Sequence, residues 1–282
     1  MIFQRIKSLF GMTTTDICQD WHGPRTPGYW SCAPINLQVI GRGEDVLLPG
    51  DVELRNSELY QSLSANTLGK DALCKLVGEY KFKTVLDLGA GDGKHCRAFL
   101  SHNKDVSAIM ADEPEWFAED LKDYVNLIFD DYVLHQFIDK FDCIWASHVL
   151  EHQRNIGLFL DKIWDDLNDG GILAITVPPI EMEAGDGHVN LFSPGHLVSQ
   201  LLEAGFNMTD MRLKIYGYNL SVICRKDAGI VPRKANFAAN RLLFHKAAMP
   251  PDLFLALDRF KAEHPSSWGG HERIPLEFEW HW

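Results

Sequence analysis

The sequence predicts an α/β protein with a doubly wound parallel sheet that ends in an antiparallel hairpin, and three observations predict it. Short apolar runs alternate with amphipathic runs between residues 66 and 227, as strands alternate with helices in such folds. A glycine-rich turn directly follows the first apolar run. The last two runs are separated only by Gly217 and Tyr218. So short a connection forces antiparallel pairing, because a parallel pair needs a crossover of about a dozen residues.

The expected elements follow one another along this region. Apolar runs predict five parallel strands, at 84–89, 106–112, 125–129, 141–147 and 172–177. Helices are expected to fill the gaps, notably at 93–101, 156–167 and 194–204. The closing hairpin is expected to pair residues 209–216 with residues 219–225.

Two flanking regions are expected on either side of this core. Residues 1–65 are rich in glycine, proline and aromatic residues, with one strand candidate at 37–48, and predict an N-terminal cap or lid. Residues 228–282 predict a helical extension, with helices at 236–247 and 251–263 and the aromatic ending FEWHW. This ending indicates docking onto the chain itself or onto a second copy, with substrate binding as the alternative.

The composition limits the classes of partner and compartment. The 282-residue chain has a formal net charge of −12, and nucleic-acid binding normally needs a basic face, so no nucleic-acid partner is expected. Six cysteines without a C-x-x-C spacing predict reduced thiols and favour the cytoplasm. We expect no membrane span and no secretion signal. The apolar spacing of residues 2–10 leaves peripheral membrane docking open beside a simply packed terminus.

The run VLDLGAGDG, residues 85–93, is a buried strand that leads into the glycine-rich turn. Its glycines let the backbone turn tightly and approach a ligand. A dinucleotide fingerprint needs a glycine where Lys94 stands, and Asp87 and Asp92 would repel two phosphates. The turn therefore favours a cofactor that carries an ammonium or sulfonium group.

Read as D-x-G-x-G-x-G, residues Asp87, Gly89, Gly91 and Gly93 resemble the first motif of class I S-adenosylmethionine (SAM) dependent methyltransferases. The resemblance covers residues 80–227. It implies a Rossmann-like, seven-stranded methyltransferase fold with SAM as cofactor and S-adenosylhomocysteine as product. The closing hairpin is typical of that fold. We expect Ala90 to contact the cofactor together with these four residues.

Further cofactor contacts are expected after the second and third strands. Asp112 stands 21 residues after Gly91, close to the spacing at which an acid accepts hydrogen bonds from a ribose diol. The alternatives are that Glu113 or Glu115 takes this place or that Asp112 only caps a helix. At the end of the third strand, Asp130 and Asp131 resemble the family position that receives the adenine amino group, and Asp130 is preferred.

The segment FDCIWASHVLEH, residues 141–152, resembles the family's fourth strand and the residues after it, which hold the methionine moiety and face the substrate. This resemblance places Ser147 and His148 at the mouth of the site. Glu151 and His152 are expected to open the next helix. His152 belongs to the family motif LEH, and its role is either catalysis or packing of the loop.

The loop after the fifth strand is expected at the carboxyl edge of the sheet, where ligands of open α/β folds bind. It holds Glu181, Glu183, Asp186 and His188, and it resembles the H-x-N-x-[FW]-S run of methyltransferases that act on small molecules or glycans. Recognition of a polar acceptor is preferred over a merely solvated loop. The residues expected to bind the acceptor are Glu151, Asp186 and Asn190.

Methyl transfer from a sulfonium is an in-line displacement, so the protein chiefly aligns the nucleophile and excludes water. An alcohol must also lose its proton, and a histidine is the usual base. His188 is the first candidate for this base and His152 the second. A magnesium ion on Glu151, His152 and Asp186 would be another way to activate the hydroxyl. No ligand pattern identifies such an ion, so no metal is predicted.

Together these inferences predict a cytoplasmic SAM-dependent O-methyltransferase. Its expected acceptor is a sugar hydroxyl of a surface glycan, of the lipopolysaccharide or capsule type, or a similar polar small molecule. An aromatic or quinone-like acceptor is the first alternative, and it would need a closed apolar pocket built from Trp21, Tyr29 and Trp30. A non-catalytic, SAM-binding partner of a glycosyltransferase is the second. A homodimer is left open.

Overall fold

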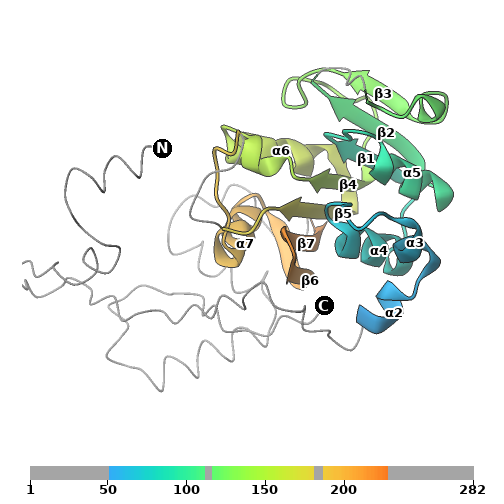
Figure 1. Ribbon diagram of the computed structural model, residues 1–282. Helices are drawn as coiled ribbons and strands as arrows, with labels where there is room; N and C mark the ends of the chain where they lie inside the picture. The colour runs from blue at the N-terminus through green and yellow to red at the C-terminus, as the bar shows by residue number, and fades with distance from the viewer. Residues whose placement is uncertain (1–50, 112–115, 181–186, 228–282) are drawn as a thin grey trace, which may run out of the picture. The chain divides into compact units, whose positions relative to one another are not determined.

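The computed structural model describes residues 51–111, 116–180 and 187–227, which form a seven-stranded sheet with helices on both faces (Figure 1). The strand order is β3-β2-β1-β4-β5-β7-β6. The strands are β1 Thr84–Leu88, β2 Asp105–Met110, β3 Asn126–Phe129, β4 Phe141–Ser147, β5 Leu167–Val177, β6 Phe206–Tyr216 and β7 Asn219–Lys226. The first five run parallel, and β7 pairs antiparallel with β5 and β6. This confirms the doubly wound sheet with its closing hairpin.

The central strands are buried on both faces because their side chains alternate between two apolar layers. Leu86, Leu88 and Ile144 pack in one layer, and Val85 and Trp145 pack in the other. Each of these side chains is at most 1% exposed. Burying one such side chain stabilises the fold by about 1.5–3 kcal/mol. The strands therefore form a rigid base for the loops at their ends.

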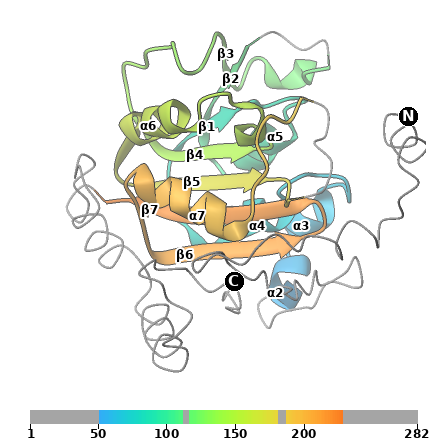
Figure 2. The same ribbon diagram turned by 90° about the vertical axis from the view of Figure 1, so that its left-hand side faces the viewer.

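The helices cover the two faces of the sheet in pairs. Residues of α6, Ile156–Asp166, and α7, Pro194–Glu203, pack in the first apolar layer, and residues of α4, Lys70–Glu79, and α5, Lys94–Ser101, pack in the second. Figure 2 shows α6 and α7 in front of the sheet, with α4 and α5 behind it. Two short helices, α2 Asp51–Arg55 and α3 Glu58–Ser62, contact α4.

Polar caps fix where α6 and α7 begin. Ser193 Oγ accepts a hydrogen bond from His196 N at 3.2 Å at the start of α7. Asn155 Oδ1 accepts one from Leu158 N at 3.3 Å at the start of α6. Because α6 begins only after this cap, Leu150–His152 forms a separate 3-10 turn. The expectation that these residues open the helix is therefore wrong.

The connections around β3 also differ from the expected alternation. The described part of the β2–β3 connection holds only a 3-10 turn, Glu119–Leu121, and the β3–β4 connection holds no helix. Asp131 Oδ1 accepts a hydrogen bond from Val133 N at 2.9 Å, and such local side-chain contacts compete with helix formation. β5 and β6 begin earlier than expected, and the pairing of each with its neighbour contains an irregularity.

Several sequence-based expectations fall outside the described residues. The cap is described only from residue 51, and the whole extension, 228–282, lies outside. The same holds for nine further residues named in the sequence analysis: Trp21, Tyr29, Trp30, Asp112, Glu113, Glu115, Glu181, Glu183 and Asp186.

Among the described residues, four cysteines are buried free thiols: Cys74, Cys96, Cys143 and Cys224. None of the helices in the described ranges is long and apolar enough to cross a membrane.

Candidate active site

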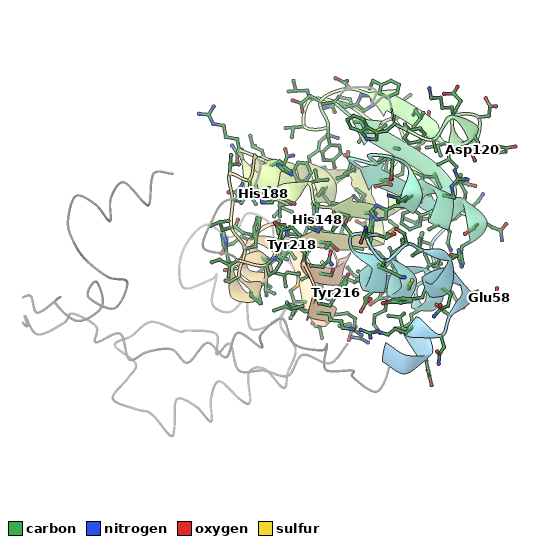
Figure 3. All side chains as sticks on the ribbon, viewed as in Figure 1. Glu58, Asp120, His148, His188, Tyr216 and Tyr218 are labelled. Carbon is green, nitrogen blue, oxygen red and sulfur yellow. The ribbon has the colours of Figure 1, made fainter. Side chains whose placement is uncertain are left out.

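The site forms at the carboxyl edge of the sheet, where β1 and β4 end side by side. Leu88 pairs with Ala146, so the turn after β1 meets the turn after β4. A Cβ atom added to Gly89 would lie 2.8 Å from Val149 Cγ2, which shows how closely the two turns approach. Figure 3 shows His148, Tyr218 and His188 on the same side of the described sheet, away from Glu58 and Asp120. This is the edge at which open α/β sheets bind ligands.

The three glycines of the turn after β1 serve different needs. Gly89, Gly91 and Gly93 all have positive φ, at 68°, 56° and 83°, a backbone conformation that glycine adopts without strain. A Cβ on Gly93 would lie 2.7 Å from Leu121 Cδ1, so packing also requires glycine there. A Cβ on Gly91 would meet nothing closer than Gly89 O at 4.0 Å. Gly91 therefore leaves space beside the backbone in which a ligand can lie.

Asp87, the last acid before this turn, is a buried carboxyl group with an unused oxygen. Its Oδ2 accepts a hydrogen bond from Cys96 Sγ at 3.2 Å, whereas its Oδ1 has no partner among the described residues. Burial, with a smaller contribution from the charge of Asp92, raises the pKa of Asp87 to about 7. A positively charged ligand would compensate this carboxylate. The residues thus fit the ammonium and sulfonium groups of SAM.

The turn after β4 begins with Ser147 and His148. His148 has φ at 56°, which is uncommon for a residue with a side chain, and its N–H donates to Thr176 O at 2.8 Å. Its ring Nε2 lies 3.2 Å from Asn219 Oδ1, and its face stacks on Tyr218 with the ring centroids 5.7 Å apart. The Oγ of Ser147 is buried and has no partner among the described residues. The hairpin β6–β7 thus holds a strained residue at the mouth of the site.

Four residues of this edge were not expected from the sequence, namely Gly69, His95, Tyr218 and Asn219. Asn219 Oδ1 also accepts a hydrogen bond from Gly69 N at 2.8 Å, which ties the start of α4 to the hairpin. The ring Nε2 of His95 lies 2.9 Å from the backbone oxygen of Leu68, and burial lowers the pKa of this ring to about 4. The signal that could have found Tyr218 and Asn219 is their place in the hairpin turn, because β7 runs antiparallel next to β5 and starts at the carboxyl edge.

A second group of polar residues joins the turn after β4 to the loop after β5. The backbone oxygen of Glu151 accepts hydrogen bonds from Val189 N at 2.9 Å and Asn190 N at 3.1 Å. Asn190 Nδ2 donates to Gln153 O at 2.6 Å. The rings of His152 and His188 meet edge to face, with centroids 4.9 Å apart. Glu151, His152, His188 and Asn190, expected from the sequence to act together, are therefore close together in space.

Asp130 and Asp131 lie at the same edge after β3, and both carboxyl groups already make local contacts. Asp130 Oδ2 lies 2.9 Å from His135 Nδ1, and its Oδ1 accepts a hydrogen bond from Asp131 N at 2.8 Å. The contact with His135, followed by this backbone bond, lowers the pKa of Asp130. Phe129 beside them is 44% exposed. Both oxygens of Asp130 thus already have partners, and an adenine amino group would have to share one of them.

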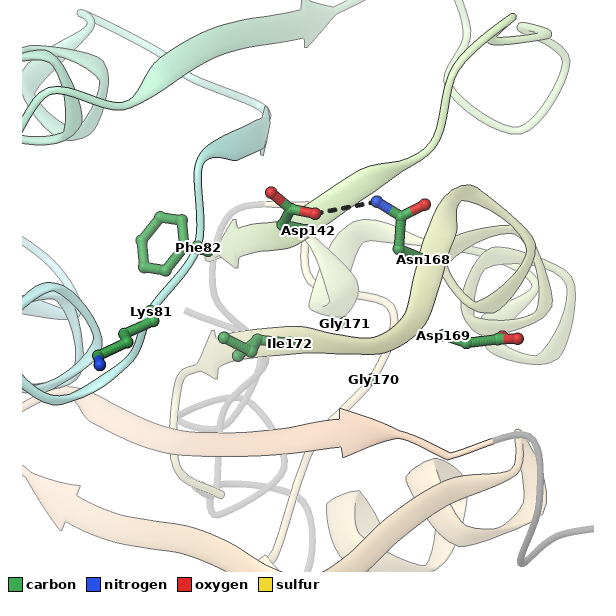
Figure 4. A pocket seen from close by; sticks show the side chains of 8 residues that line it. All are labelled: Lys81, Phe82, Asp142, Asn168, Asp169, Gly170, Gly171 and Ile172. Atoms are coloured by element: carbon green, nitrogen blue, oxygen red, sulfur yellow. Dashed lines mark hydrogen bonds between the residues drawn. The ribbon is translucent and has the colours of Figure 1, made fainter.

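A shallow pocket of about 240 Å³ lies at the opposite edge of the sheet (Figure 4). It is formed at the amino ends of β1, β4 and β5 and includes Asp142. Asp142 Oδ1 accepts a hydrogen bond from Asn168 Nδ2 at 3.0 Å, and its Oδ2 accepts from Lys83 N at 3.0 Å and Thr84 N at 3.1 Å. Because this carboxylate is already satisfied and lies away from the glycine turn, the pocket is separate from the candidate site.

Comparison with known proteins gives a family and a set of similar structures. A sequence family described as "Methyltransferase domain" matches residues 70–210, half of the chain. Among solved structures, the chain is similar to the Burkholderia thailandensis 1,6-didemethyltoxoflavin-N1-methyltransferase, with 23% identity, 55% of this chain and 76% of that chain covered, and a TM-score of 0.49. It is also similar to the N-methyltransferase NodS from Bradyrhizobium japonicum WM9. The two are 16% identical, the match covers 62% of this chain and 95% of NodS, and the TM-score is 0.48. A third similar structure is the [4+2]-cyclase SpnF. The two are 17% identical, the match covers 56% of this chain and 80% of SpnF, and the TM-score is 0.48.

No curated protein sequence matches the chain. The matched residues 70–210 contain the glycine turn, β4 with the turn after it, and β5. The seven-stranded sheet and the closing hairpin are those expected from the resemblance of the glycine turn to the first methyltransferase motif. The chain therefore belongs to the methyltransferase domain family and has the fold of the class I SAM-dependent methyltransferases.

Proposed function

We propose that this methyltransferase moves the methyl group of SAM to a hydroxyl group of a polar small molecule or of a sugar in a surface glycan. The observation that carries this proposal is the meeting of two groups at one edge of the sheet. One is the buried carboxyl group of Asp87, whose Oδ1 has no hydrogen-bond partner among the described residues, in the same strand and turn as Gly91, beside whose backbone there is free space. The other is the polar group of Glu151, His152 and His188, which can act on an acceptor.

When bound, SAM supplies a methyl group on a positively charged sulfur. When the methyl group is transferred, the sulfur keeps the electron pair of the broken carbon–sulfur bond and becomes the neutral thioether of S-adenosylhomocysteine. Asp87 would balance the positive charge of the cofactor, and Gly91 would leave room for it. Asp112 or Glu113 would receive the ribose hydroxyls and Asp130 or Asp131 the adenine amino group, as the resemblance implies. Ala90, Ser147 and His148 would line the remainder of the cofactor site.

The acceptor oxygen forms the new bond to carbon and must give up its proton. His188 is our first choice to take this proton and His152 our second, because His188, in the loop after β5, and His152, in the turn after β4, both lie beside Glu151. Asp186 and Asn190 are proposed to bind the acceptor. The preference for a sugar rests on the acidic charge of the chain and on the polar residues of this loop. Four buried free thiols suit the reducing cytoplasm, where we place the reaction.

Calorimetric titration with SAM, followed by an assay of S-adenosylhomocysteine formation against a panel of acceptors, tests this function. The panel should contain sugars and nucleotide sugars, phenols and amines. We expect SAM to bind and product to form with a hydroxyl-bearing polar acceptor. Gly89→Val should abolish SAM binding because its side chain would collide with Val149. SAM binding without turnover on any acceptor would favour a non-catalytic binding partner, and unchanged affinity of the Gly89→Val protein would overturn the assignment of the turn.

A further inference from the structure

Glu151, His152 and His188 form a compact cluster of metal-ligating groups. One ligand atom from each lies within 4.8 Å of the other two. The cluster joins two segments far apart in the sequence, because the backbone of Glu151 accepts the N–H groups of Val189 and Asn190. The main-chain hydrogen bonds therefore hold His188 next to the turn that carries Glu151 and His152.

The carboxylate of Glu151 is the most unusual member of this cluster. Its side chain is 0% exposed, and neither oxygen accepts a hydrogen bond from the described residues. His148 Nδ1 lies 3.2 Å from Oε1, close enough for an ion pair but without hydrogen-bond geometry. A buried carboxylate without hydrogen bonds is costly and calls for a compensating cation.

The neighbouring histidine is oriented as a ligand. His152 Nδ1 lies 3.1 Å from the carbonyl oxygen of Gly187. A carbonyl only accepts hydrogen bonds, so Nδ1 of the neutral ring carries the proton and Nε2 keeps its lone pair. Nε2 lies 4.0 Å from Glu151 Oε1. A backbone carbonyl that fixes the tautomer in this way is the usual outer contact of a metal-binding histidine.

The kind of metal follows from the ligand atoms. Two imidazole nitrogens and one carboxylate oxygen suit Zn²⁺, Mn²⁺ or Fe²⁺, whereas Mg²⁺ prefers oxygen ligands throughout. Ligands about 2.1 Å from a tetrahedral metal lie about 3.4 Å from each other. The ligand atoms must therefore draw together by about 1 Å, which rotations of His152, 43% exposed, and His188 can provide.

We propose that Glu151, His152 and His188 bind one first-row divalent transition metal, Zn²⁺ or Mn²⁺, which leaves coordination positions open for oxygen atoms of the acceptor. The role of this metal in the reaction rests on the proposed function, whereas the binding of the metal does not. With the metal bound, the two histidines would be ligands in place of acting as the base. A hydroxyl coordinated to the metal would have a lower pKa and would give its proton to solvent water. A tetrahedral metal has one position left for an acceptor hydroxyl, and expansion to five-coordination would admit a second, adjacent hydroxyl of the same acceptor.

Metal binding can be measured without any turnover. The full-length protein, stripped with EDTA, is titrated with Zn²⁺ by calorimetry and with Co²⁺ by visible absorption, which reports the coordination of the bound ion. We expect one ion per chain, because each chain supplies all three ligands. Glu151→Gln, His152→Gln and His188→Gln should each weaken binding about 100-fold or more. His102→Gln, a matched change on a histidine at the end of α5, should leave binding unchanged.

Loss of a folded structure is checked by circular dichroism, and His188→Gln remains informative if Glu151→Gln does not fold, because His188 is partly exposed. Absence of a stoichiometric site, or equal loss in the His102→Gln control, would overturn the inference. The proposed function fails separately, if SAM does not bind or no acceptor is methylated while the metal site is present. Full turnover in EDTA with no metal bound would overturn the role of the metal in the reaction, whereas the binding titration by itself decides whether the site exists.

Discussion

Asp87 shows how a single buried residue links the fold to the cofactor. Its side chain is 1% exposed, and its pKa of about 7 follows mainly from burial. In the cofactor-free protein this carboxyl group therefore carries a proton up to near-neutral pH. A cation bound beside it favours the ionised form and lowers its pKa. Binding of SAM must then displace a proton below about pH 7.

This linkage predicts that SAM affinity rises with pH. If the bound state requires ionised Asp87, affinity should be about tenfold lower at pH 6 than at pH 8. Calorimetry in two buffers of different ionisation enthalpy measures both the affinity and the released proton. Asp87→Asn should bind SAM more weakly and without this pH dependence. A flat profile in the unchanged protein would show that the carboxyl group is not coupled to the cofactor.

Gly91 and Gly93 allow packing and binding to be separated at the residue scale. Gly93→Ala places a methyl group against Leu121 and Phe117 at a positive φ and should lower the free energy of unfolding by about 2–4 kcal/mol. Gly91→Ala enters open space and should cost only about 1 kcal/mol of stability, while weakening SAM binding. Urea unfolding and SAM titration of both variants measure these effects. Equal loss of stability in the two would contradict the packing argument.

At the scale of elements, the hairpin β6–β7 is part of the site as well as of the sheet. Its turn supplies Tyr218, which stacks on His148, and Asn219, which contacts both Gly69 and His148. The antiparallel direction of β7 makes this possible, because its amino end meets the carboxyl end of β5. A parallel strand in the same place would present the opposite end of its chain to the site.

Asn219→Ala is expected to lower both stability and turnover. The substitution leaves the Gly69 N–H without its acceptor and removes one of the contacts that hold the His148 ring, at a cost of about 1–3 kcal/mol. Asn207 in β6 is the matched control, because its Oδ1 accepts only a local hydrogen bond from Thr209 N at 2.9 Å and lies at the far end of the hairpin. Asn207→Ala should affect stability without reducing turnover. A fall in turnover of the same size in both variants would contradict a role for the hairpin in positioning His148.

At the scale of the whole described unit, a buried ion pair connects the first major helix to the last edge strand of the sheet. Lys214 Nζ of β6 lies 2.8 Å from Asp71 Oδ2 of α4, and both side chains are at most 7% exposed. The two residues are 143 positions apart. This contact helps close the chain around the α4–α5 face of the sheet.

Removing one partner should cost far more than removing both. Asp71→Asn removes the negative charge 2.8 Å from the buried Lys214 ammonium and should lower the free energy of unfolding by about 3–5 kcal/mol. The double change Asp71→Leu with Lys214→Met should recover much of this loss, since two buried charges are replaced by apolar groups. Urea unfolding of the single and double variants measures these differences in the free energy of unfolding. A loss below about 1 kcal/mol in Asp71→Asn would show that the pair contributes little.

The sequence by itself determined the seven strands, the helices α5, α6 and α7, the antiparallel hairpin and the place of the glycine turn, because these depend on local patterns. A continuous apolar run indicates a strand that is buried on both faces, and the two residues between 216 and 219 allow only a hairpin. Only the tertiary structure decided that Tyr218 and Asn219 face His148, that Glu151 is buried without hydrogen bonds, and that His152 and His188 meet. These contacts join segments brought together by sheet order and backbone hydrogen bonds between loops, which no local pattern specifies.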